Sequence, residues 1–111
     1  MKPSMSVANL LNSVKDVELV PGTGATRLVN NDRQAFVIVE IEGDRAVVRR
    51  ERARRIGAGV TEFQRYNFQT DPNGMAYELR KGADGLWHVV GDSRGYKFIL
   101  GAKIEYKDYG L

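Results

Sequence analysis

Cysteine is missing from the 111-residue chain, and this absence excludes several kinds of site at once. Without thiols the protein has no disulfide framework, no thiolate zinc site and no cysteine nucleophile. Histidine is scarce as well, because His88 is the only one. In the run LWHVV it alternates with Trp87 and Val89, which favours a partly buried structural histidine on a strand. We therefore expect no metal site and no cofactor.

Signatures of catalysis and of membrane insertion are also missing. The chain contains no HExxH motif and no Ser-His-Asp order, and its carboxylates are scattered at turns and polar strand positions. The glycines of PGTGATR are not followed by the Lys-Ser/Thr that completes a P-loop. The longest apolar runs are about five residues, far below the roughly 20 of a membrane-spanning helix, and no secretory signal opens the chain. These absences predict a soluble, cytoplasmic protein that is not an enzyme and contacts no membrane.

What the chain does contain is a globular composition, 42% hydrophobic and 28% charged, in a length that suits one domain. Within residues 1–16, four apolar residues follow the i, i+3, i+4, i+7 spacing of a single helix stripe: Val7, Leu10, Leu11 and Val14. Ser4 or Ser6 is available as the N-cap. Because so short a helix is marginal alone, its stripe must pack on its own domain or on a second subunit. The second alternative predicts a homo-oligomer held through this helix.

From residue 17 to residue 111, short β-like runs alternate with turn residues. They recur at spacings of roughly 8–12 residues, about seven strands in all, from VELV at 17–20 to AKIEYKDY at 102–109. No helical pattern lies between them, which favours an antiparallel barrel or sandwich over βαβ units. Closing the sheet removes exposed edges, so we predict a mostly β fold: a small SH3-like antiparallel barrel with a short N-terminal helix.

Two turn signals indicate hairpins. Gly43-Asp44 is typical of a tight turn between the half-buried strand AFVIVEIE and the arginine-rich RAVVRRERARR. In DPNG at 71–74, proline presets φ, while asparagine and glycine tolerate positive φ. We predict that this second turn pairs the strand at 61–70 with the strand at 75–81, and that the resulting long hairpin extends beyond the barrel as an arm.

Positive charge is concentrated in one segment. The whole chain carries a net charge of +3, but residues 45–65 hold seven arginines against Glu51 and Glu62. In a regular strand Arg50, Arg52 and Arg54 lie on one face. Guanidinium groups match the geometry of phosphate and carboxylate oxygens, and several together give salt-sensitive binding of nucleic acid. The alternative is a solvated strand whose arginines pair with nearby carboxylates, at about 0.2–1 kcal/mol per pair.

Aromatic residues follow the arginines. Tyr66 and Phe68 share one face of a strand, with Arg65 beside them. Rings combined with cations are typical of nucleic-acid binders, although strand aromatics also build cores. The predicted ligand-binding set therefore combines cations and rings from this part of the chain: Arg45, Arg50, Arg52, Arg54, Arg65, Tyr66 and Phe68.

Several short motifs occur together in a familiar order: GATRL, the DR of NNDR, VIVEIE, VVRRERARR, DPNG, GLW and the closing Tyr106, Asp108 and Tyr109. As a set they resemble a group of small, uncharacterised proteins encoded by bacteriophages and prophages, over roughly residues 20–110. The resemblance implies a phage or bacterial context, hence the cytoplasm of the host cell, and a compact β fold. It carries no catalytic or ligand residues to this chain.

These observations predict a non-catalytic phage or prophage binding module whose arginine-rich strand engages nucleic acid or a phosphorylated, nucleotide-like ligand. The alternative is a small anti-defence inhibitor that acts by protein–protein contact with a host complex. A structural role in the virion is a third hypothesis.

Overall fold

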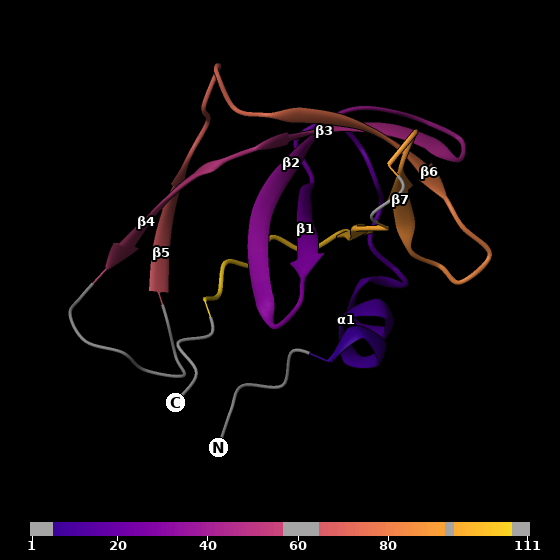
Figure 1. The fold of residues 1–111 in the computed structure, drawn as a ribbon, viewed down its shortest axis with the longest axis horizontal. Helices are drawn as coiled ribbons and strands as arrows, with labels where there is room; N and C mark the ends of the chain where they lie inside the picture. The colour runs from indigo at the N-terminus through magenta and orange to yellow at the C-terminus, as the bar shows by residue number, and fades with distance from the viewer. Residues whose placement is uncertain (1–5, 57–64, 93–94, 108–111) are drawn as a thin grey trace.

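Six antiparallel strands close into a barrel (Figure 1), in a computed structural model that describes residues 6–56, 65–92 and 95–107. Their order around the barrel is β1-β2-β3-β6-β7-β8, and β8 pairs with β1 to complete the ring. The strands are β1 (Gly24–Val29), β2 (Asp32–Glu42), β3 (Arg45–Arg50), β6 (Ala76–Lys81), β7 (Trp87–Val89) and β8 (Lys97–Leu100). The predicted mostly β fold, a small antiparallel barrel with one short N-terminal helix, is confirmed.

The interior of the barrel is filled by apolar side chains from every strand. Its largest fully buried members include Phe36, Ile38, Val48, Leu79 and Phe98. The rings of Phe36 and Phe98 meet edge to face, with centroids 4.9 Å apart, a geometry that aromatic pairs favour. Side chains from strands far apart in the sequence therefore hold the ring closed.

The turn at Gly43-Asp44 joins β2 to β3 as predicted. Glu42 pairs with Arg45 across the two-residue turn, and Gly43 has a φ of 58°. This positive φ suits glycine, which has no Cβ to clash with the backbone. The first long hairpin is therefore confirmed.

Helix α1 (Val7–Val14) covers one end of the barrel (Figure 1). Ser6 is its N-cap, because its Oγ accepts a hydrogen bond of 3.2 Å from the backbone N of Asn9. Leu10, only 6% exposed, packs with Leu86 and Ile99 of the barrel, and the other three residues of the predicted stripe pack against the same cluster. The barrel thus buries Leu10 and covers part of the other three side chains, so the stripe packs on its own domain.

Two predicted strands are wrong. Residues 17–20 form no ladder, because the chain turns at Pro21-Gly22, where Gly22 has a φ of 95°, before pairing begins at Gly24. After β8, Gly101 has a φ of 117°, and the regular ladder with β1 ends. Residues 102–107 then make only one isolated bridge, between Arg33 and Tyr106. Residues 108 and 109 of that predicted strand lie outside the described residues.

The arm exists, but its strands pair differently from the prediction. β4 (Arg52–Ile56) and β5 (Arg65–Gln69) form a separate two-stranded sheet beyond the barrel (Figure 1). The predicted pairing of 61–70 with 75–81 across the DPNG turn is wrong, because β6 already pairs with β3 in the barrel wall. The two chain segments that form β3 and β6 continue outward as β4 and β5. Among the described residues, no helix has the length and apolarity to cross a membrane.

Candidate functional site

The arm begins where Glu51 interrupts the arginine-rich strand. Its side chain is buried, its carboxylate pairs with the Lys103 ammonium, and its backbone N donates to the Ala35 carbonyl at 3.2 Å. These contacts separate β3, which ends at Arg50, from β4, which begins at Arg52. The arginine-rich segment is therefore not one regular strand.

The turn at 71–74 forms the other side of the arm's stem. The backbone N of Gly74 donates to the Asp71 carbonyl at 2.9 Å, and that of Asn73 donates to the Asp71 carboxylate at 3.0 Å. A Cβ added to Gly74 would lie 2.2 Å from the Arg50 carbonyl oxygen. The turn can close against the strand only because residue 74 is glycine.

Arg45, at the start of β3, is held by two carboxylates. It donates through Nε to Glu78 at 2.6 Å and through a terminal nitrogen to Glu40 at 2.9 Å. These hydrogen bonds, first that to Glu40 and then that to Glu78, raise the pKa of Arg45. Glu40 and Glu78 belong to the strands on either side, so this arginine ties three adjacent strands together on the barrel surface.

Arg50, at the end of β3, is engaged more completely. Its guanidinium donates to both carboxylate oxygens of Glu105, at 2.6 and 3.0 Å, and to the Ala35 carbonyl at 2.9 Å. It also lies 5.9 Å from the centroid of the core ring Phe36. Only 28% of its side chain and 13% of the Glu105 side chain are exposed. A bidentate pair of this kind is stronger than a surface ion pair.

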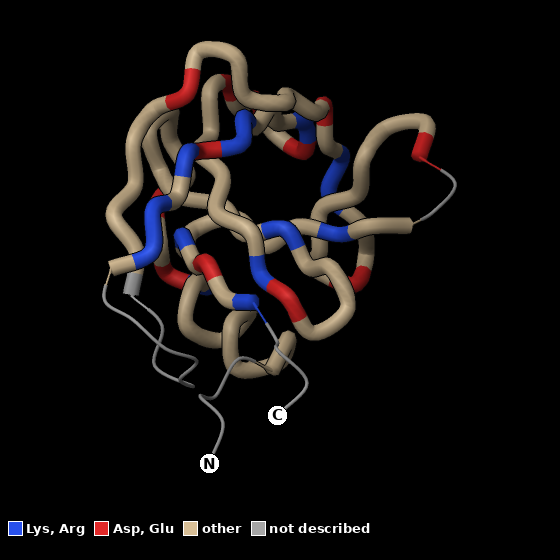
Figure 2. Tube along the Cα trace, turned by 60° about the vertical axis from the view of Figure 1, so that its left-hand side comes forward, with Lys and Arg blue, Asp and Glu red and all other residues tan. Residues whose placement is uncertain are grey.

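The outer face of the arm carries the exposed arginines of β4. The side chain of Arg52 is 63% exposed and reaches Asp71 only at 3.7 Å. Arg54 is exposed and forms no ion pair with another described residue. Their cross-strand partners, Gln69 and Asn67, are uncharged and also exposed. Figure 2 shows the basic residues following the strand from the barrel into the arm.

A shallow hollow lies at the outer end of the arm. Its volume is about 290 Å³, and it is lined by Arg54, Arg55, Ile56 and Asn67. Guanidinium groups and an amide side chain provide donors that suit anionic oxygens.

The inner face of the arm holds the aromatic residues. Phe68 pairs with Ala53 and Tyr66 pairs with Arg55, so these side chains point away from the face of Arg52 and Arg54. The two rings stack on each other, with centroids 6.4 Å apart. The Lys103 ammonium lies 5.5 Å from the centroid of Phe68, which links this face to the chain that follows β8.

The structure thus divides the predicted set of ligand-binding residues. Arg52 and Arg54 share the outer face of the arm. Arg50 instead binds Glu105, which belongs to the chain that follows β8, and Lys103 of the same chain contacts Phe68. The expected grouping of Arg50 with Arg52 and Arg54 is wrong, because it assumed a regular strand through residue 51. The backbone of Arg65 pairs with Ile56, and its side chain lies outside the described residues.

The only histidine lies on the barrel, away from the arm. His88 Nε2 is 3.2 Å from the Asp84 carboxylate, which also lies 3.7 Å from the Lys97 ammonium. The hydrogen bond from the backbone N of Leu86 is the first cause that lowers the pKa of Asp84, and that with His88 is the second. Across the described ranges, no three His, Asp or Glu side chains come together as a metal site.

Sequence reasoning missed Asn67 and Gln69 as members of the basic face. The register between β4 and β5 places them on this face, and no turn signal in the described part of the chain predicts that register. Comparison with protein-family models, curated proteins and solved structures finds no significant match to this chain.

Proposed function

We propose that the protein binds nucleic acid without catalysis, through phosphate contacts made by the outer face of the β4–β5 arm. The observation that carries this proposal is the exposure of Arg52 and Arg54 side by side, with uncharged neighbours opposite them. Residues two apart on a strand lie about 7 Å from each other. At this spacing the two arginines can engage two separate phosphates, which favours a nucleic-acid backbone as the ligand.

The contact is compact, not a broad coating of duplex. Arg45 and Arg50, which add charge to the sequence segment, already bind carboxylates of the protein. The arm also projects from the barrel as a narrow two-stranded sheet (Figure 1). A small number of phosphate contacts predicts modest affinity with a shallow dependence on salt. The phage or prophage context remains part of the proposal, and it rests on the sequence resemblance alone.

The test is fluorescence anisotropy with a labelled single-stranded oligonucleotide over a series of salt concentrations. With about two phosphate contacts, log K should fall against log salt with a slope of about −1.4. Arg54→Gln should remove one contact and bring the slope to about −0.7. The matched control is Arg80→Gln, which removes an exposed arginine from β6 in the barrel wall and should leave the slope unchanged. No binding by the wild type at low salt would refute the proposal.

A second candidate is contact with an acidic protein surface, as an anti-defence inhibitor would make. Ile56, 46% exposed beside Arg54 and Arg55, favours it, because an apolar side chain among cations suits a protein partner. Purification from host lysate with nuclease treatment separates the two functions. A stoichiometric protein that stays bound to the wild type, and is lost from Arg54→Glu, would support the second candidate.

A further inference from the structure

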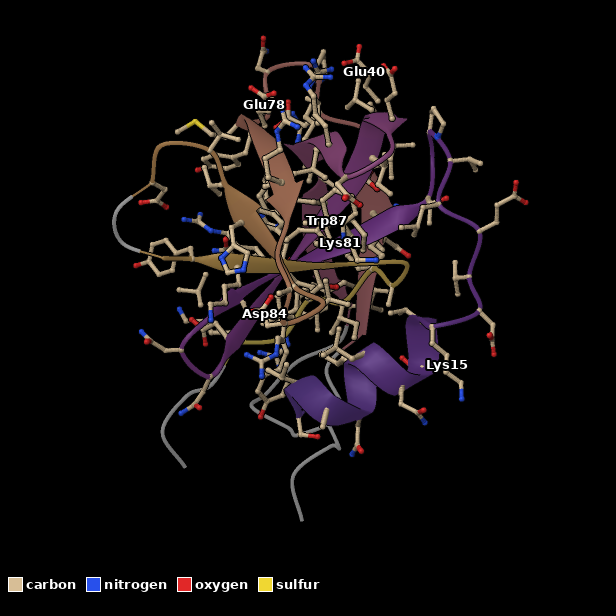
Figure 3. All side chains as sticks on the ribbon, turned by 90° about the vertical axis from the view of Figure 1, so that its right-hand side faces the viewer. Lys15, Glu40, Glu78, Lys81, Asp84 and Trp87 are labelled. Carbon is tan, nitrogen blue, oxygen red and sulfur yellow. The ribbon has the colours of Figure 1, made fainter. Side chains whose placement is uncertain are left out.

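A second hollow opens on the side of the barrel that carries the helix, away from the arm. It lies between α1, the connection that follows it and the turn from β6 to β7, and its volume is about 310 Å³. Figure 3 faces this side, with Trp87 and Lys81 side by side near the centre and Lys15 at the end of the helix below them. The lining residues are Leu11, Val14, Lys15, Val17, Leu19, Lys81, Gly85, Trp87, Ile99 and Leu100.

The lining is apolar except for its two lysines. Trp87, Ile99 and Leu100 are almost completely buried, and they form the barrel side of the cavity. Leu11 and Val14 line it from the helix, and Val17, 39% exposed, is the most open of its apolar residues. Most of the residues that line the cavity are apolar, and its volume is at the lower end of the range of small-ligand sites, about 300–1,000 Å³.

Two glycines lie close to the helix beside the cavity. Gly85 has a φ of 82°, and the nearest atom to a Cβ placed there would be in Leu11, 3.9 Å away. At Gly101 an added Cβ would lie only 2.8 Å from the Cβ of Val14. The backbone at Gly101 thus approaches the end of the helix closely, and the turn at Gly85 lies within van der Waals reach of Leu11.

The charged residues that line this cavity have one sign. Lys15 follows the last residue of α1, and Lys81 is the last residue of β6. Both side chains are exposed, and neither forms an ion pair with another described residue. No acidic residue in the described part of the chain lines the cavity. Lysine stems can cover an apolar wall while their ammonium groups stay in water at the rim.

We propose that this cavity binds a small molecule with an apolar body and a single carboxylate group. The body lies against lining residues that include Trp87 and Leu100, and the carboxylate is attracted by the positive charge of Lys15 and Lys81. Charge complementarity selects an anion over a neutral or cationic molecule of the same shape. This site shares no residue with the arm, so its test does not depend on whether the arm binds nucleic acid.

Trp87 provides the readout, because it is the only tryptophan in the chain and it lines the cavity. Tryptophan emission is followed while octanoate is added, always below its micelle-forming concentration. The emission should change saturably, and octanol and octylammonium, which share the apolar body, should bind at least about fivefold more weakly. The absence of a saturable change with octanoate, or equal binding of octylammonium, would overturn the proposal.

Substitutions of the lysines test whether octanoate binds in this cavity. Lys15→Gln and Lys81→Gln should each weaken octanoate binding by up to about fivefold, and the double variant should weaken it more than either single substitution does. Lys107→Gln, which removes an exposed lysine that does not line the cavity, should bind like the wild type. Arg54→Gln should also leave octanoate binding unchanged. Since the substituted lysines are exposed, thermal melting should show wild-type stability, and unaltered octanoate affinity in the folded double variant would refute the site.

Discussion

The two ends of one arginine-rich stretch differ in what surrounds them. In the barrel wall, Arg45 and Arg50 each bind carboxylates of neighbouring segments, at distances of 2.6–3.0 Å. On the arm, Arg52 has one carboxylate at 3.7 Å and Arg54 forms no ion pair within the described ranges. The residue type is the same throughout, so the packing around each arginine decides whether it stabilises the fold or is available to a ligand.

The reason for the difference lies in the layers on either side of the strand. β3 has neighbours on both edges, β2 and β6, and the C-terminal segment crosses its end. Each neighbour supplies an acid within reach of β3. β4 has β5 on one edge, and the residues of β5 that face Arg52 and Arg54 are uncharged. A projecting two-stranded arm simply offers fewer internal partners than a barrel wall.

The largest expected effect is on the barrel side. Arg50→Met should lower the free energy of unfolding by about 2–4 kcal/mol, because it leaves the poorly exposed Glu105 carboxylate without its bidentate partner. Urea denaturation measures this change. Arg54→Met is the matched control and should stay within about 0.5 kcal/mol of the wild type. Equal effects of the two substitutions would break the distinction between barrel and arm arginines.

A smaller effect, on oligonucleotide affinity, is expected when Arg52 loses its contact with Asp71. Asp71→Asn removes the carboxylate nearest to Arg52 and should strengthen oligonucleotide binding by up to about fivefold, since an exposed pair is worth at most about 1 kcal/mol. Asparagine retains an oxygen that can accept from Asn73 N, so the turn should persist. Anisotropy at one fixed salt concentration measures the change, and weaker binding would contradict the role given to Arg52.

The smallest expected effect concerns Asp84, a barrel acid at an exposed turn. Its pKa is lowered in the folded protein, first by the hydrogen bond from Leu86 N, so the folded state favours the carboxylate. The resulting stabilisation is present above the pKa of the unfolded chain and is lost as pH falls through the lower folded value. Asp84→Asn should therefore flatten the acid side of a stability–pH profile measured by thermal melting. A steeper acid limb in the variant would contradict this assignment.

Local patterns predicted the elements whose signals lie close together in the chain. The helix stripe and the Ser6 cap involve residues within one or two turns, and the Gly43-Asp44 hairpin involves adjacent residues. Steric limits on φ and the period of the helix act over such short distances. The DPNG turn was also predicted, but the pairing of β6 with β3 was not. A turn sets the local direction of the chain, and it does not decide which strand the following segment pairs with.

The candidate site was predicted only in part for the same reason. Arg50 is separated from Glu105 by 55 residues, and Arg45 from Glu78 by 33, so no local pattern shows that these arginines are engaged. The interruption at Glu51 depends on Lys103, which is 52 residues away. Likewise, Tyr66 and Phe68 lie on the other face of the arm from Arg52 and Arg54, and only the strand register shows this.

The sequence by itself determined that this protein is mostly β, that a short capped helix precedes its barrel, and that its positive charge is concentrated between residues 45 and 65. Composition and short-range periodicity are enough for those conclusions, because the forces involved act between near neighbours. Only the tertiary structure decided which arginines remain exposed, which face the aromatic residues occupy, and that two lysines flank an apolar cavity beside Trp87. Each of these depends on contacts between distant segments, which form when the barrel closes.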